Sequence, residues 1–253
     1  MVNNRFIFIF IILFIFNCAG NNSENKSTLN SSKNALDKAI LFISKEKYTK
    51  AKYELETIIF NEPFSIYAGK AHFYLGEAKF YSKDYQGAIE EYNIYLNQSA
   101  QDLELVKKAQ FMICNSWYNI TLGFKRDQTN TYMALDKLQY YIEKESLKEY
   151  YEDIYSMILE LRNKLAQKDF NTALLYLKLK QIDAAEIYFK NILNEFYDSD
   201  YIDDSIMKIA YIKNLESYNN AKIYLLNNKN NFTSNDKYEE AMESISKSVE
   251  LNN

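Results

Sequence analysis

The sequence is poor in glycine, proline, histidine and cysteine, and these absences narrow what the protein can do. Its 253 residues include 5 glycines and 1 proline. These are too few for glycine-rich phosphate loops, collagen-like repeats or most turn-dense all-β folds. One histidine (His72) and two cysteines (Cys18 and Cys114) leave little for metal binding or nucleophilic catalysis. We therefore expect no enzymatic activity, no metal and no cofactor.

An excess of positive charge is also absent. The 30 lysines and arginines are outnumbered by 34 acidic residues, which gives a net charge of −4, and the isoelectric point is about 5.3. A nucleic-acid partner is not expected, because such proteins carry a basic patch or stripe. The composition is 47% hydrophobic and 25% charged, so the chain can bury a sizeable core.

The long hydrophobic run lies at the N-terminus. It extends from Phe6 to Phe16 and follows Arg5, the only charged side chain before residue 24. A membrane-spanning helix needs about 20 apolar residues, so this shorter run is typical of a secretory signal peptide, here 1–17. Cys18 follows it almost directly, which resembles the bacterial lipoprotein box. The alternatives are an ordinary signal peptide or an uncleaved anchor that buries Cys18.

The lipoprotein box implies that Cys18 becomes the first mature residue and carries acyl chains such as palmitate. Two or three acyl chains give stable membrane anchoring. Ala19 is not the aspartate that retains lipoproteins at the inner membrane, so the expected location is the periplasmic face of the outer membrane. The polar stretch over 18–33 predicts a flexible, lipid-anchored tether.

From Ala35 onward, apolar residues recur at spacings of three and four, which predicts helices. The sequence also shows a longer repeating pattern that resembles the tetratricopeptide repeat (TPR). Counted within one repeat, small residues occupy positions 8 and 20 and large ones positions 11, 17 and 24. The matching residues are Ala39, Phe42, Tyr48, Ala51 and Leu55; Gly76, Tyr85, Ala88 and Tyr92; Ala173, Tyr176, Ile182, Ala185 and Phe189; and, one residue short, Ala210, Tyr218 and Ala221. Small residues let the two helices of a repeat approach, and each repeat covers the apolar face of the next.

The predicted fold is therefore all-α, a TPR-like α-solenoid of about five helix–turn–helix repeats. The expected repeats are 34–66, 68–101, 106–145, 150–199 and 202–232, followed by a capping helix and tail over 233–253. The third repeat is stretched by a loop from Thr121 to Thr131. The fourth opens with Tyr150 to Leu179, which contains no glycine or proline and predicts one long helix.

Several stretches together resemble the BamD family of outer-membrane β-barrel assembly lipoproteins. They are Arg126-Asp127-Gln128-Thr129-Asn130-Thr131-Tyr132, Leu161-Arg162-Asn163-Lys164-Leu165-Ala166, and Phe170-Asn171 before Ala173 and Tyr176. The proline that the family usually carries at repeat ends is missing after Tyr197.

The resemblance implies a non-enzymatic periplasmic scaffold of the β-barrel assembly complex. Its C-terminal repeats would dock on the barrel-inserting, BamA-like subunit, beside other assembly lipoproteins. Its N-terminal repeats would meet unfolded outer-membrane barrel substrates. The alternative is another TPR envelope lipoprotein that acts as an adaptor for cell-wall or envelope machinery.

Two candidate partner sites follow from repeat positions. Positions 2, 5, 9, 12 and 13 face the concave groove of a TPR repeat, and in the second repeat they are Lys70, Phe73, Glu77, Phe80 and Tyr81. Three aromatic side chains there predict a groove for an apolar or aromatic-ended peptide. The alternative is that Phe80 and Tyr81 pack under the third repeat.

The second candidate site is the inserted loop. Arg126 and Asp127 lie in an insertion without a packing role, which makes the loop a candidate docking element. His72 and Cys114, by contrast, are expected to be packing residues on helices, because no partner motif for catalysis accompanies them.

Overall fold

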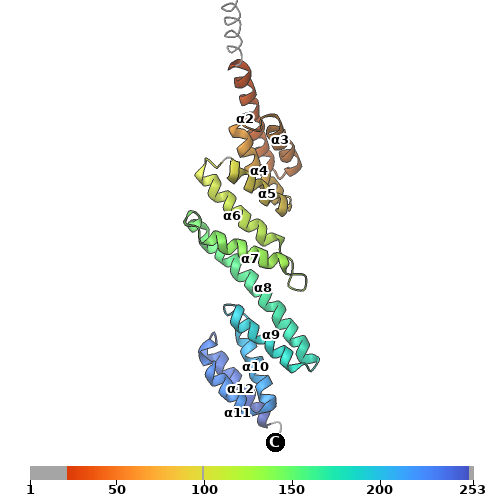
Figure 1. Cartoon of the computed structure of the whole chain (residues 1–253), viewed down its shortest axis with the longest axis vertical. Helices are drawn as coiled ribbons and strands as arrows, with labels where there is room; N and C mark the ends of the chain where they lie inside the picture. Colours follow the sequence, from red (N-terminus) through yellow and green to blue (C-terminus); the bar gives the residue numbers. More distant parts are fainter. Residues whose placement is uncertain (1–21, 99, 251–253) are drawn as a thin grey trace, which may run out of the picture. The chain divides into compact units, whose positions relative to one another are not determined.

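A computed structural model of the protein describes residues 22–98 and 100–250, and all the regular elements in these ranges are helices (Figure 1). The predicted all-α, TPR-like class is confirmed. The chain divides into two compact units, an N-terminal unit up to Ala109 and a C-terminal unit from Gln110. The boundary falls within α6 (Leu103–Ile120).

The N-terminal unit contains α2 (Asn22–Ser44), α3 (Tyr48–Asn61), α4 (Ile66–Tyr81) and α5 (Tyr85–Gln98). Each of these helices packs against the next one along the chain. Ala39 and Ala51, which occupy the small positions of the first repeat, are completely buried. Their core is completed by Leu36, Leu55, Ile58, Ala71, Leu75 and Ala78.

The flexible tether expected over 18–33 is wrong for residues 22–33, which belong to α2. This segment holds no glycine or proline, and extending an existing helix is far easier than nucleating a new one. Ser32 is buried, so the helix already packs before the first predicted repeat begins. Cys18 and the signal peptide lie outside the described residues.

The C-terminal unit continues with α7 (Thr129–Ile142), the 3₁₀ turn η2 (Glu145–Tyr150), α8 (Tyr151–Lys178) and α9 (Ile182–Glu195). It ends with α10 (Ile202–Glu216), α11 (Tyr218–Asn227), η3 (Lys229–Asn231) and α12 (Asn235–Glu250). The uninterrupted helix that the run from Tyr150 predicts is α8, with 28 residues. At 1.5 Å per residue it is about 42 Å long.

Helix α12 covers the end of the C-terminal unit. Tyr238, Ala241 and Ile245 are buried at a spacing of three and four, and the helix packs against α10 and α11. Its start is fixed by Asp203 of α10, which accepts hydrogen bonds from the backbone and the hydroxyl of Thr233. The final helix is therefore tied to the unit by polar as well as apolar contacts.

Three of the turns between paired helices share one geometry. Glu46, Lys83 and Lys180 all have positive φ, at 56°, 67° and 60°. The residue after each donates its N–H to a carbonyl five residues earlier, at 2.8, 2.9 and 2.9 Å, as in a Schellman helix end. Such positions favour glycine, so a glycine-poor sequence builds its repeat turns under mild backbone strain.

Candidate functional site

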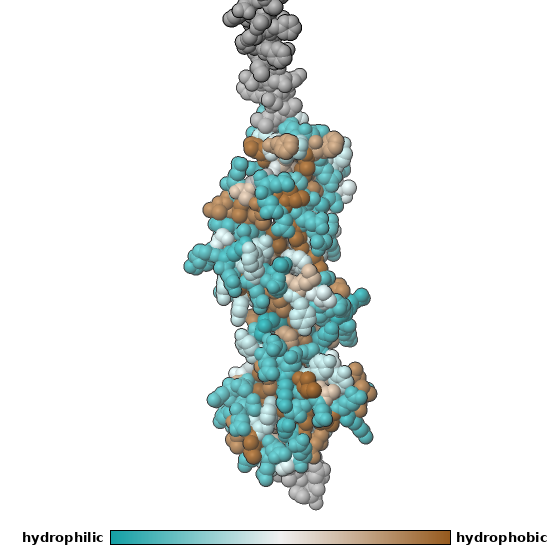
Figure 2. Space-filling model, in the orientation of Figure 1, coloured by the Kyte–Doolittle hydropathy of each residue, from teal (hydrophilic) through white to brown (hydrophobic). Residues whose placement is uncertain are grey.

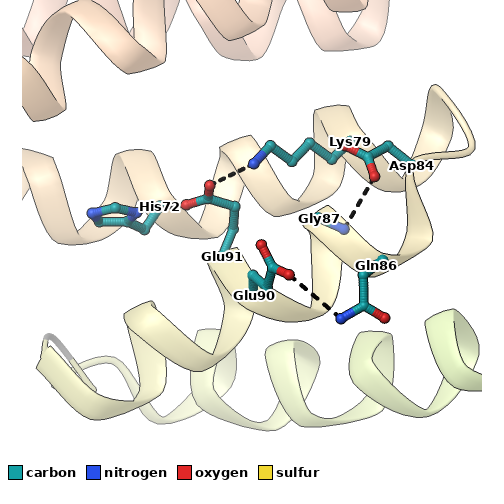
Figure 3. A network of polar contacts seen from close by, with 7 residues as sticks. All are labelled: His72, Lys79, Asp84, Gln86, Gly87, Glu90 and Glu91. Atoms are coloured by element: carbon teal, nitrogen blue, oxygen red, sulfur yellow. Dashed lines mark hydrogen bonds and ion pairs between the residues drawn. The ribbon is translucent and has the colours of Figure 1, made fainter.

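The polar centre of the N-terminal unit is the carboxylate of Glu91 on α5. Lys79 Nζ donates to Oε1 at 2.6 Å, and His72 Nδ1 lies 2.7 Å from Oε2; Figure 3 shows these side chains. His72 and Lys79 are seven residues apart on α4, so two helical turns bring them to one face. The network therefore joins α4 to α5 through a carboxylate that is itself buried.

The network holds the carboxylate of Glu91 in its ionised form. Burial acts to raise the pKa of Glu91, but hydrogen bonds from His72 and Lys79 outweigh it, and the pKa lies below its usual value. A carboxylate with both oxygens occupied by donors is a poor proton acceptor. We interpret the network as a clamp between two helices, consistent with the expectation that His72 is a packing residue.

The turn into α5 is built from a second polar contact. Asp84 Oδ1 accepts the backbone N–H of Gly87 at 3.1 Å (Figure 3). A Cβ on Gly87 would lie 2.5 Å from Asp84 Oδ2, so the carboxylate fits closely only over a glycine. This cap satisfies one of the free N–H groups at the start of α5.

An apolar cavity of about 490 Å³ opens beside the Glu91 network. Its lining consists of Glu56, Ile59, Phe60, Pro63, His72, Leu75 and Glu91. Phe60 is 86% exposed although it forms one wall. The charge of Glu91 is compensated within the protein, and apart from the exposed Glu56 the opening offers mainly apolar surface to a partner.

A second cavity, of about 510 Å³, lies by the turn between α3 and α4 and by the end of α5. It is lined by Phe64, Ser65, Ile66, Lys70, Tyr95, Gln98, Gln101 and Asp102. Phe64 is fully exposed and Ile66 is 60% exposed. We call Phe60, Phe64 and Ile66 the turn patch. On the face shown in Figure 2, such apolar residues form small patches on a largely hydrophilic surface.

The predicted peptide groove is corrected by the burial of Phe73. This side chain is completely buried, with its ring centroid 5.8 Å from that of Tyr92 and 5.6 Å from that of Tyr95. Phe73 is therefore part of the core and cannot grip a peptide. The repeat position predicts a side chain on the concave groove, but Tyr92 and Tyr95 of α5 fill the space that Phe73 faces.

The other groove residues are also engaged or separated. Glu77 is buried and pairs with Lys108 Nζ at 2.5 Å. Phe80 packs edge-on against Tyr85, and Tyr81 stacks on Tyr48 of the first repeat with ring centroids 6.0 Å apart. Lys70 is exposed and lines the second cavity. The five residues therefore do not form one binding surface.

The inserted loop has a defined internal structure. The buried Gln128 donates from Nε2 to the carbonyls of Gly123 (3.0 Å) and Arg126 (2.9 Å), and its Oε1 accepts from Thr131 (2.8 Å). Asp127 accepts the N–H of Thr129 at 3.0 Å, and hydrogen bonding by Thr129 holds the pKa of Asp127 below its usual value. Asp127 therefore has a capping role at α7, while the exposed Arg126 remains available to a partner.

The cysteine in the third repeat is a packing residue. Cys114 is completely buried and unpaired. Burial raises the pKa of its thiol to about 12, so the reactive thiolate is not populated at neutral pH. This agrees with the expectation that Cys114 is a packing residue on a helix. Among the described residues, no group of three or more potential ligands could hold a metal ion.

Sequence reasoning missed the turn patch because it considered only repeat positions. Phe60 and Phe64 lie near the end of the first repeat, where the pattern assigns no aromatic residue. For Phe60, a signal was available in the helical spacing of α3. Tyr53 and Phe60 are seven residues apart and share one face of α3, whereas the core residues Ala51, Leu55 and Ile58 share another.

These features define the class of protein as an all-α assembly of TPR-like helix pairs. Its helices bury an apolar core, and cavities open on its surface. The sequence profile of the outer membrane lipoprotein family YfiO matches residues 30–222. The chain belongs to this family. None of the helices in the described ranges is long and apolar enough to cross a membrane.

Two individual proteins are similar to the chain. The outer membrane protein assembly factor BamD of Rickettsia prowazekii (strain Madrid E) is 23% identical over 160 residues, which cover 63% of this chain and 63% of the relative. A thermophilic TPR protein of Thermus thermophilus has a TM-score of 0.35 and 11% identity, over 85% of this chain and 98% of that one. The assignment of the fold rests on the helix pairs themselves.

Proposed function

We propose that the protein is a non-enzymatic scaffold of outer-membrane β-barrel assembly, anchored through Cys18 to the periplasmic face of the outer membrane. The observation that carries this proposal is the family match over 30–222. The similarity to an assembly factor supports it. A stack of helix pairs suits this role, because it presents extended surfaces to several partners at once.

The turn patch is the proposed contact for unfolded barrel substrates, in place of the aromatic groove. Phe60, Phe64 and Ile66 are exposed beside two cavities, and large exposed apolar groups beside a cavity mark interaction sites. Barrel strands that have not yet inserted carry alternating apolar side chains. Such side chains match the cavity beside Glu91, which is mainly apolar.

The C-terminal unit is the proposed contact for the barrel-inserting subunit. Tyr211 and Leu215 lie one turn apart on α10 and are 52% and 58% exposed. Arg126 and Asp127, in the inserted loop of the same unit, are proposed as a second docking point. Neither set overlaps the turn patch in sequence, so the two functions are separable by substitution.

The experiment compares two double variants of the full chain. F60S/F64S should weaken crosslinking to unfolded barrel substrates and leave co-purification with the barrel-inserting subunit unchanged. Y211S/L215S should have the reverse effect. Tyr53→Ser is the matched control, because Tyr53 is 70% exposed on α3 but lines neither cavity. If neither variant affects its partner, the envelope adaptor becomes the better interpretation.

The membrane anchor is tested separately. Cys18→Ser should prevent lipidation, because a serine hydroxyl cannot form the thioether to the diacylglycerol. Metabolic labelling with palmitate and membrane fractionation measure this directly. A variant that still takes up label and sediments with the outer membrane would disprove the assignment of Cys18.

A further inference from the structure

The C-terminal unit has a groove between α6 and α8 that the proposed function does not use. Its volume is about 440 Å³. The residues on α6 are Phe111, Asn115, Tyr118 and Asn119, and those on α8 are Asp153, Ser156, Met157 and Glu160. Each set follows helical spacing, so one stripe of each helix faces the groove.

The α8 side of the groove carries two acidic side chains. Asp153 and Glu160 are both exposed, and no lysine or arginine lies in the lining. In the part of the chain that the structure describes, neither carboxylate forms an ion pair. Lys164, one turn beyond Glu160, interacts with it electrostatically, but its Nζ donates its hydrogen bond to Thr121 Oγ1 at 2.6 Å and not to the carboxylate. The groove thus differs from the Glu91 network, where two donors occupy the carboxylate.

The α6 side supplies aromatic rings. Phe111 is held by stacking on Tyr150, with ring centroids 4.2 Å apart. Tyr118 donates its hydroxyl to Glu160, which fixes one of the two carboxylates. Rings and carboxylates on facing walls suit the side chains of lysine and arginine, whose stems pack on apolar surface and whose charged ends pair with acids.

We infer that this groove binds an extended, basic segment of a partner protein. Asp153 and Glu160 are seven residues apart on one helix, which places them about 10 Å apart along its axis. In a polyproline II segment, residues three apart lie on one side at about 9 Å. Two basic side chains with that spacing match the two carboxylates.

The amides in the groove favour an extended segment over a helix. A helix satisfies its own backbone hydrogen bonds, whereas a polyproline II segment leaves its N–H and C=O groups open. Asn115 and Asn119 lie between the aromatic residues of α6 and offer both donors and acceptors to such groups. The occupant is therefore recognised by two cations and an open backbone.

The test uses the detergent-solubilised full chain and a fluorescein-labelled ten-residue peptide with proline spacers and two arginines three positions apart. Fluorescence anisotropy measures the dissociation constant. Asp153→Asn or Glu160→Gln should each weaken binding about threefold, and D153N/E160Q about tenfold, because each exposed ion pair with the peptide contributes only modestly to affinity. Higher salt should weaken binding to the parent chain and affect the double variant less.

Glu152→Gln is the matched control, because Glu152 is an exposed acid on α8 outside the groove. It should change the dissociation constant less than twofold. Equal weakening by E152Q and D153N would overturn the site and leave only general attraction to an acidic protein. Equal binding of a peptide with glutamines in place of both arginines would overturn charge recognition. Circular dichroism of each variant verifies that the fold is intact.

Discussion

The Glu91 network in the N-terminal unit and the α6–α8 groove in the C-terminal unit use acidic side chains in opposite ways. Glu91 is buried and receives both Lys79 and His72, so the neighbouring cavity is mainly apolar. Asp153 and Glu160 are exposed and form no ion pair among the described residues. The two units therefore present different surfaces, a mainly apolar opening in one and a groove with two exposed acids in the other. The difference at Glu91 comes from the two donors that α4 places against its carboxylate.

The largest expected effect is the difference in stability between substituting a buried and an exposed phenylalanine in the N-terminal unit. Phe73→Ala should lower the free energy of unfolding by about 3–5 kcal/mol, because it leaves a cavity at a completely buried position. Phe60→Ala should change it by less than about 0.5 kcal/mol, because Phe60 is 86% exposed. Urea unfolding of both variants measures the difference. Similar losses would show that Phe60 is structural.

The second prediction tests helix approach in the C-terminal unit. Ala185 is completely buried at the small position of the second helix in its repeat. Ala185→Trp should cost about 1–3 kcal/mol or more, because the side chain must force α8 and α9 apart. Thermal unfolding followed by circular dichroism provides the measurement. An unchanged melting temperature would contradict the repeat register at α9.

The third prediction compares the two kinds of carboxylate directly. Glu91→Gln should lower the free energy of unfolding by about 1–3 kcal/mol, because Lys79 loses its charged acceptor in a buried site. Asp153→Asn should stay within about 0.5 kcal/mol, since no ion pair is lost. Both substitutions remove one negative charge, so a general charge effect would change both equally. Chemical unfolding at neutral pH distinguishes these outcomes.

The fourth prediction concerns how the contribution of Glu91 to stability depends on pH. The folded pKa of Glu91 is lower than its ordinary value of 4.5, so the folded state favours the ionised form. Its contribution to stability is fully present above the unfolded pKa and is lost as pH falls through the folded one. Between neutral pH and acid, the stability gap between the parent and E91Q should therefore shrink. A gap that stays constant would contradict the network.

The smallest effect concerns the strained turns. Lys180→Gly should raise the free energy of unfolding by up to about 1 kcal/mol, because glycine adopts the positive φ of 60° at this position without a Cβ clash. The gain is limited because glycine also increases the entropy of the unfolded chain. The matched control is Ser217→Gly between α10 and α11, where φ is −167°. That substitution should destabilise, because the Ser217 hydroxyl caps α11.

The spacing of small and apolar residues along the chain was sufficient to predict the fold class. Small residues at Ala39, Ala51, Ala173 and Ala185, with large residues at the intervening repeat positions, predicted helix pairs, because a close helix crossing leaves no room for a larger side chain. The absence of glycine and proline predicted α8 as one helix. The same reasoning failed at the N-terminus, where α2 starts at Asn22. A polar composition is compatible with helix as well as tether when a packed helix follows it.

The sequence by itself determined which faces of the helices would be apolar, since that depends on spacing along one chain. Tertiary structure decided which residues were left for partners. Phe73 is buried in the core because Tyr92 and Tyr95 of α5 pack on it, whereas Phe60 is exposed. Glu91 was compensated because α4 brings His72 and Lys79 to it, and Asp153 was not. Such outcomes depend on what the neighbouring helix places opposite each side chain, and spacing within a single helix carries no information on it.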